Sequence, residues 1–148
     1  MYELFLTLHL LTAIFAIGPL THAVTTASRG LRTADSSATH SASRMVTIYS
    51  YASVVVVIFG FGLMSMKAPW NNEPVAQFSE LWIWLSVVLW IIAVAIALAV
   101  VVPALDKATA ALGRGESVSS MTGRVAGSGG VIALLFLVIV ILMVYQPA

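Results

Sequence analysis

The segment from residue 81 to residue 105 reads LWIWLSVVLWIIAVAIALAVVVPAL and contains no charged side chain. A helix rises about 1.5 Å per residue, so about 20 mainly apolar residues can cross the roughly 30 Å hydrocarbon core of a bilayer. Within lipid every backbone N–H and C=O group must be bonded internally, which favours a helix here despite the valine content. Residues 81–105 therefore predict a transmembrane helix.

Three other segments have the same character: residues 4–24, residues 45–64 and residues 125–145. The last of them reaches spanning length only by including its Gly- and Ala-rich first turns. Of all residues, 60% are hydrophobic and 9% charged, whereas soluble domains carry about 25% charged residues. The sequence predicts one all-α domain over residues 1–148, a polytopic bundle of four transmembrane helices in the lipid bilayer.

Basic residues divide the predicted loops into two classes. The first and third predicted loops, which lie on one side of the membrane, carry six of the seven Lys and Arg residues. The loop on the other side carries only Lys67. The six are Arg29, Arg32, Arg44, Lys107, Arg114 and Arg124. Short loops rich in Lys and Arg stay in the cytoplasm. Both termini and the loop over residues 65–80 are therefore predicted to be non-cytoplasmic.

Composition also narrows the function classes. The chain has no cysteine, which excludes thiolate metal sites and thiol nucleophiles. A net charge of +1 gives no argument for nucleic-acid binding. Proton relays and ion pathways normally need intramembrane Asp, Glu, Lys or Arg, and the four predicted spans contain none. We expect neither a pump nor an enzyme, no resident cofactor, and no metal site.

His9 is the one ionisable residue well inside a predicted span, roughly 7 Å from its outer end by the helical rise. A neutral imidazole could ligate haem iron or hydrogen-bond a quinone. The alternative is a structural hydrogen bond to a hydroxyl or a backbone carbonyl of another helix, and this is the outcome we expect. His22 and His40 lie too far along the chain to complete a bis-histidine haem site. Met64 or Met143 would be weaker axial ligands.

Small residues predict where helices approach one another closely, because association in lipid depends on backbone contact. We expect the third and fourth spans to pack through such positions. The candidates are Gly60, Gly62, Ala93, Ala97, Gly123 and Gly127.

Two prolines predict bends inside the spans, because proline removes a backbone hydrogen bond and clashes with the preceding turn. Pro19 lies in the first span and Pro103 near the end of the third. Trp90 must find a partner for its indole N–H within the membrane. Another subunit or the hydroxyl of Ser53 could supply it.

Several short motifs resemble a known family. The similar motifs are Tyr2 with LHLL at 8–11, AIGPL at 16–20, SELWI at 79–83, VPAL at 102–105 and LMVYQP at 142–147. The family consists of uncharacterised four-helix bacterial integral membrane proteins, catalogued as a domain of unknown function. The resemblance covers nearly the whole chain and implies a multi-pass protein of the bacterial plasma (inner) membrane. This chain has Gln146 where that family leads us to expect lysine.

The first span also resembles two other groups through its histidine and glycine. These are copper-resistance membrane proteins and the four-helix protoporphyrinogen oxidase of the haem pathway. That oxidase places a lysine within its third helix, whereas the first basic residue here, Lys107, follows the span.

Three functions remain after these exclusions. The first is a non-catalytic accessory subunit, or an assembly or stability factor, of a larger membrane complex; the haem-related resemblance suggests a respiratory complex. Its partners would be other integral membrane subunits or further copies of itself. The second is a redox protein that binds haem or a quinone through His9. The third is an oligomeric carrier of a neutral solute.

Overall fold

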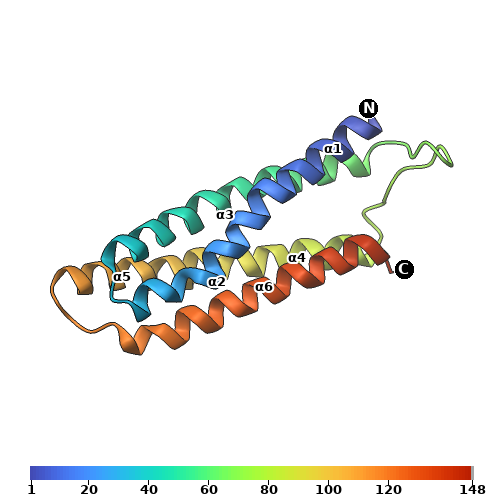
Figure 1. Ribbon diagram of the computed structural model, residues 1–148. Coiled ribbons are helices and arrows are strands. Elements are labelled where there is room, and N and C mark those ends of the chain that lie inside the picture. Colours follow the sequence, from blue (N-terminus) through green and yellow to red (C-terminus); the bar gives the residue numbers. More distant parts are fainter. Residues whose placement is uncertain (148) are drawn as a thin grey trace.

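The computed structural model describes residues 1–147, and in that part of the chain all regular structure is helical. Four helical rods are long and apolar enough to cross a membrane: Tyr2–Arg32, Ser36–Met64, Leu81–Gly113 and Ser119–Tyr145. They lie side by side as an elongated antiparallel bundle (Figure 1). The predicted all-α fold with four spanning helices is confirmed.

The rods contain several shorter elements. In chain order these are α1 (Tyr2–Thr12), η1 (Ala13–Ile17), α2 (Gly18–Arg32), α3 (Ser36–Met64), α4 (Leu81–Ile96), η2 (Ala97–Val101), α5 (Val102–Gly113), η3 (Ser119–Met121) and α6 (Thr122–Tyr145).

The helices extend beyond the predicted spans at the basic end of the bundle. Helix α3 begins at Ser36, nine residues before the predicted start at 45, and α5 continues to Gly113 rather than ending at 105. Asp35 sets the start of α3, since its Oδ1 accepts hydrogen bonds from the backbone N–H groups of Ser37 and Ala38 at 3.0 and 3.2 Å. Such a cap compensates the unpaired first turn of a helix. Polar residues outside the apolar runs therefore stay helical.

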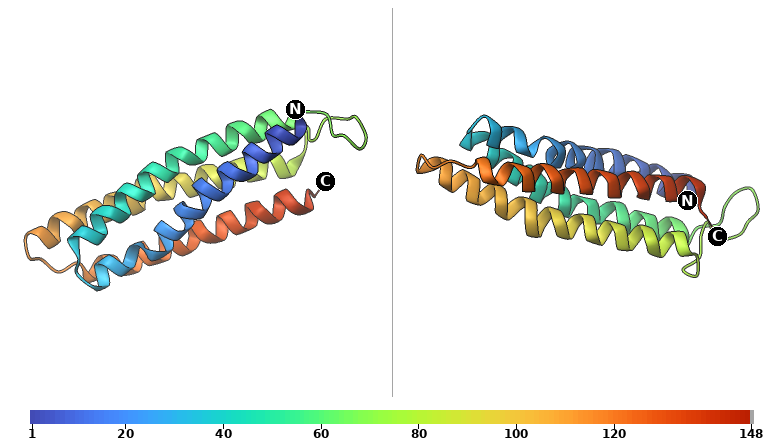
Figure 2. Two further views of the ribbon diagram at one scale, coloured as in Figure 1. Left: turned by 45° about the horizontal axis from the view of Figure 1, so that its top comes forward. Right: turned by 90° about the horizontal axis from the view of Figure 1, so that it is seen from below.

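Both chain ends lie at the same end of the bundle as the segment between α3 and α4 (Figure 1). The two further views in Figure 2 agree, with N, C and this long connection at one end. A single bridge between Lys67 and Pro74 folds the connection into a loop. Its exposed Trp70 packs edge-to-face on Tyr2, with ring centroids 5.6 Å apart. The loop thus contacts the first turn of α1.

Each predicted bend coincides with a change of helical hydrogen bonding. A wide, five-residue π-helical turn, η1, ends two residues before Pro19, and another, η2, ends two residues before Pro103. Proline cannot donate a backbone hydrogen bond, and its ring crowds the carbonyl four residues earlier. A wide turn relieves that crowding. Each proline thus lies just after a wide turn of its rod.

Small side chains form the centre of the bundle. The buried face of α3 repeats at spacings of four and three residues and consists mostly of hydroxyl residues: Thr39, Ser43, Val46, Ser50 and Ser53. Small residues at such an interface let helix backbones approach. Large apolar residues such as Ile14, Phe15 and Leu134 instead lie on the outside, 64%, 70% and 61% exposed. An apolar exterior around a small-residue interior is the arrangement that a lipid solvent favours.

Candidate functional site

His9 contacts the backbone of α3. Its Nδ1 lies 2.9 Å from the carbonyl oxygen of Val56. A carbonyl oxygen can only accept, so in the neutral ring Nδ1 carries the proton and Nε2 keeps its lone pair. Within residues 1–147, Nε2 has no hydrogen-bond partner. This is the interhelical contact that we expect from the sequence for a structural role of His9.

Two glycines of α3 make room for α1. A Cβ added to Gly60 would lie 3.1 Å from Cε1 of His9, and one added to Gly62 would lie 2.6 Å from Cε1 of Phe5. The imidazole and the phenyl ring therefore occupy the space that side chains on α3 would need. Gly60 and Gly62 serve close packing of the first and second rods, a pairing that the sequence did not specify.

The other residues considered for a haem site differ in their surroundings. Met64 is buried among Trp82, Ile83 and Leu142, where its thioether fills the core of the other rods. Met143 and His22 are exposed on the bundle surface. Across the described chain no group of three His, Cys, Asp or Glu side chains could hold a metal ion.

Trp90 finds its partner inside the chain. Its indole N–H donates to the hydroxyl of Ser53 on α3 at 3.0 Å, and that hydroxyl donates to the carbonyl of Ser50 at 2.6 Å. Of the two partners that the sequence left open, the structure has Ser53. Two buried hydroxyls nearby, those of Ser50 and Ser86, have no side-chain hydrogen bond within residues 1–147.

Hydroxyl contacts also join α3 to α5 at the basic end. Ser43 donates to Oδ1 of Asp106 at 2.5 Å, and the hydroxyls of Thr39 and Thr109 lie 2.7 Å apart. These pairs were not predicted from the sequence. The spacing of hydroxyl residues could have indicated them, because Thr39, Ser43 and the serines farther along α3 fall on one helical face.

The small residues predicted to pack the third and fourth spans have different surroundings in the structure. Ala93 and Ala97 are fully buried in the core that contains Ile132 and Phe136 of α6. Gly123 and Gly127 do not take part, since nothing lies within 4 Å of a Cβ added to either.

Gly129, which the sequence analysis did not single out, forms the close contact of α6. A Cβ on Gly129 would lie 2.1 Å from the carbonyl oxygen of Val24 on α2. The backbone of the fourth rod therefore touches the first rod at this glycine.

Comparison with known proteins gives one family. Residues 3–147 match the family described as "Predicted integral membrane protein (DUF2269)". No curated protein and no solved structure matches the chain. Four apolar rods with buried small residues agree with that description. The chain therefore belongs to the DUF2269 family of integral membrane proteins.

Proposed function

We propose that this protein is a non-catalytic subunit, or an assembly or stability factor, of a larger membrane complex. One observation carries the proposal: α6 bears Gly123, Gly127 and Gly130 on a single face, and all three are exposed with nothing within 4 Å of an added Cβ. Their spacings of four and three residues keep them in one line along the helix. We call this line the glycine face.

The glycine face is not needed for the chain's own packing, because α6 contacts α2 through Gly129. Exposed large side chains continue the same line toward the chain end: Leu134, Leu137 and Ile141. Lipid-facing glycines give no packing advantage to an isolated bundle, whereas a neighbouring helix can approach their backbone closely. The occupant that we propose is a transmembrane helix of another subunit. A respiratory complex is the specific candidate, from the resemblance of the first span to haem-related proteins.

Transport and catalysis have less support. The buried polar side chains of the bundle are serine and threonine hydroxyls: those of Thr39 and Ser53 bond to another hydroxyl or to a backbone carbonyl, that of Ser43 bonds to Asp106, and those of Ser50 and Ser86 have no partner within residues 1–147. No Asp, Glu, Lys or Arg lies within the four predicted spans. A proton or ion pathway normally depends on such groups.

Association is tested by Gly127→Leu, with Leu137→Val as the matched change farther along the same face. The protein is tagged, solubilised in mild detergent and isolated with whatever integral membrane subunits accompany it. Gly127→Leu should remove most of the co-isolated subunit, because the leucine side chain holds the neighbouring helix away, while Leu137→Val should retain it. Equal recovery with both variants would contradict the proposal.

The proposed orientation in the bacterial inner membrane places both termini outside the cytoplasm. It rests on the six basic residues of the end that joins α2 to α3 and α5 to η3, against Lys67 at the other. The chain has no cysteine, so any labelling of a variant with a single cysteine at Ser36, Asn71 or Ser119 comes from that position alone. A membrane-impermeant thiol reagent added to intact cells should label only position 71. Labelling of 36 and 119 with 71 protected would invert the orientation.

A second candidate function is haem or quinone binding at His9. The observation in its favour is the free lone pair of Nε2, left by the bond from Nδ1 to Val56, because ligating histidines commonly orient their other ring nitrogen in this way. A stoichiometric haem spectrum of the purified protein would favour this function over the first.

A further inference from the structure

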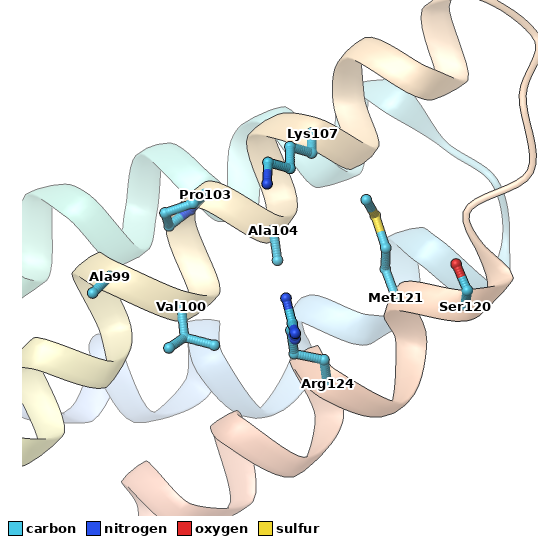
Figure 3. A pocket seen from close by; sticks show the side chains of 8 residues that line it. All are labelled: Ala99, Val100, Pro103, Ala104, Lys107, Ser120, Met121 and Arg124. Atoms are coloured by element: carbon cyan, nitrogen blue, oxygen red, sulfur yellow. The ribbon is translucent and has the colours of Figure 1, made fainter.

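A cavity of about 560 Å³ opens between the third and fourth rods at the basic end of the bundle. Its walls come from η2 and α5 on one side and from η3 and the first turn of α6 on the other. Figure 3 shows Lys107 and Arg124 pointing toward one another across it, with Ala104 between them. Two cations from different helices therefore converge on one space.

No acid offsets these two charges. The lining of the cavity contains no Asp or Glu. Each acid at this end of the bundle is occupied elsewhere: Asp35 caps α3, Asp106 accepts from Ser43, and Glu116 pairs with Arg114 at 2.9 Å. The hydrogen bond from Arg114 also lowers the pKa of Glu116, which keeps it ionised in that pair.

The other three acids of the chain, Glu3, Glu73 and Glu80, belong to the opposite end. In the described chain the one ion pair is Arg114 with Glu116, so neither Lys107 nor Arg124 is in an ion pair. Two like charges held without a counter-charge raise the local positive potential. An anion in this space would lower that potential.

The cavity also lies at the membrane boundary. Lys107 follows the third predicted span by two residues, and Arg124 immediately precedes the fourth. Ala99, Val100 and Pro103 line the side of the cavity toward the membrane interior, within the apolar run. The space therefore has a cationic mouth and an apolar floor. A ligand that fits both must carry an anionic group and a hydrocarbon part.

We propose that this cavity binds one anionic phospholipid. Its phosphate lies between Lys107 and Arg124, and its hydrocarbon chain leaves along Ala99 and Val100 into the bilayer. The arginine fork matches two phosphate oxygens and the lysine ammonium acts as a point charge. The volume lies within the range of small-molecule sites. Basic pockets between membrane helices recognise lipid headgroups by this chemistry.

The test counts lipid on the intact purified protein by native mass spectrometry in a neutral detergent. Phosphatidylglycerol and phosphatidylcholine with identical chains are added in parallel. The wild type should retain one phosphatidylglycerol in clear preference to phosphatidylcholine. Lys107→Gln and Arg124→Gln should each reduce that preference about fivefold, and the double variant about 25-fold, since each juxtamembrane cation contributes about 1 kcal/mol.

The matched control is Arg29→Gln with Arg32→Gln, which removes two exposed charges from the same end of the bundle but outside the cavity. It should keep the preference, as should the charge-conserving Lys107→Arg. Thermal melting of every variant establishes that it is folded. Equal losses in the control and in the cavity double variant would overturn the proposal, because the effect would then be general charge attraction.

A second arm separates a lipid from a soluble anion. Inorganic phosphate in excess should not displace phosphatidylglycerol, because it cannot use the apolar floor. Displacement by inorganic phosphate alone would assign the cavity to a soluble phosphate and overturn the lipid assignment. Neither arm depends on the glycine face, so the result is independent of the proposed partner subunit.

Discussion

The two halves of the first rod are held in the bundle in different ways. Helix α2 buries seven residues, among them Leu20 and Val24 with no exposed surface, and packs against both α3 and α6. Helix α1 buries none and packs mainly against α3, through His9 and aromatic rings such as Phe5. The wide turn η1 and Pro19 separate the halves.

The difference shows what stabilises a helix in lipid. The parts of both halves inside the predicted span, residues 4–24, carry no charged side chain, so apolarity does not distinguish them there; α2 alone continues beyond the span, to Arg29 and Arg32. What distinguishes them is close contact: α2 meets the backbone of α6 at Gly129, whereas α1 is joined to α3 by a single imidazole hydrogen bond and ring packing. We expect α2 to hold the bundle together and α1 to be the more easily displaced half.

The largest effect is expected where α2 meets α6. Gly129→Ala places a methyl group 2.1 Å from the carbonyl oxygen of Val24, so the two backbones must separate. The expected loss is about 3 kcal/mol, at the upper end for overpacking. Unfolding in mixed detergent with increasing dodecyl sulfate measures it. The matched control, Gly127→Ala, adds the same methyl group in open space and should be neutral or slightly stabilising. Equal losses from both would contradict the contact.

A smaller effect should separate two leucines of the same rod. Leu20 in α2 is fully buried, whereas Leu10 in α1 is 52% exposed. Leu20→Ala leaves a cavity and loses packing contacts, for an expected cost of about 2 kcal/mol. Leu10→Ala only replaces a lipid-facing side chain and should cost less than about 0.5 kcal/mol. The same unfolding measurement applies. If Leu10→Ala costs as much as Leu20→Ala, the two halves are held alike.

The smallest effect concerns the one polar contact that holds α1. His9→Ala removes the bond to Val56 and should cost about 0.6 to 1 kcal/mol, the range for hydrogen bonds between membrane helices. His9→Gln retains a side-chain donor and should preserve most of the stability. Absorption spectra of the same preparations examine the alternative role. A stoichiometric haem band in the wild type that both variants lose would make His9 a ligand rather than a structural residue.

The four spans could be predicted because hydropathy measures solvation by lipid, and each long uncharged run appears as a rod in the structure. Helix ends could not be predicted in the same way. Residues 36–44 and 106–113 are polar enough to leave the membrane, yet they remain helical because Asp35 caps one segment and Ser43 with Asp106 joins the two. Helix formation and membrane solvation are separate properties of the chain.

Close contacts were the least predictable feature. Glycine spacing singled out Gly123 and Gly127, whereas the close backbone contact of α6 is at Gly129. All are glycines of one helix, and only the rotation of α6 about its axis decides which of them faces α2. That rotation depends on all the neighbouring helices together. For Trp90 the sequence left two partners open, another subunit or the hydroxyl of Ser53, and the structure has Ser53.

The wide turn η1 lets the first rod hold one residue more than a regular helix without changing the faces on either side of it. Each residue of an α-helix turns the chain by about 100°, and a five-residue wide turn accommodates one more residue than a regular turn would. Deleting one residue from 13–17 should therefore let the helix become regular while α1 keeps its present rotation relative to α2. His9 would still face the carbonyl of Val56. Two chains of this family can thus differ by one residue between His9 and Leu20 and still present the same face of α1 to α3, provided that the longer chain forms the wide turn.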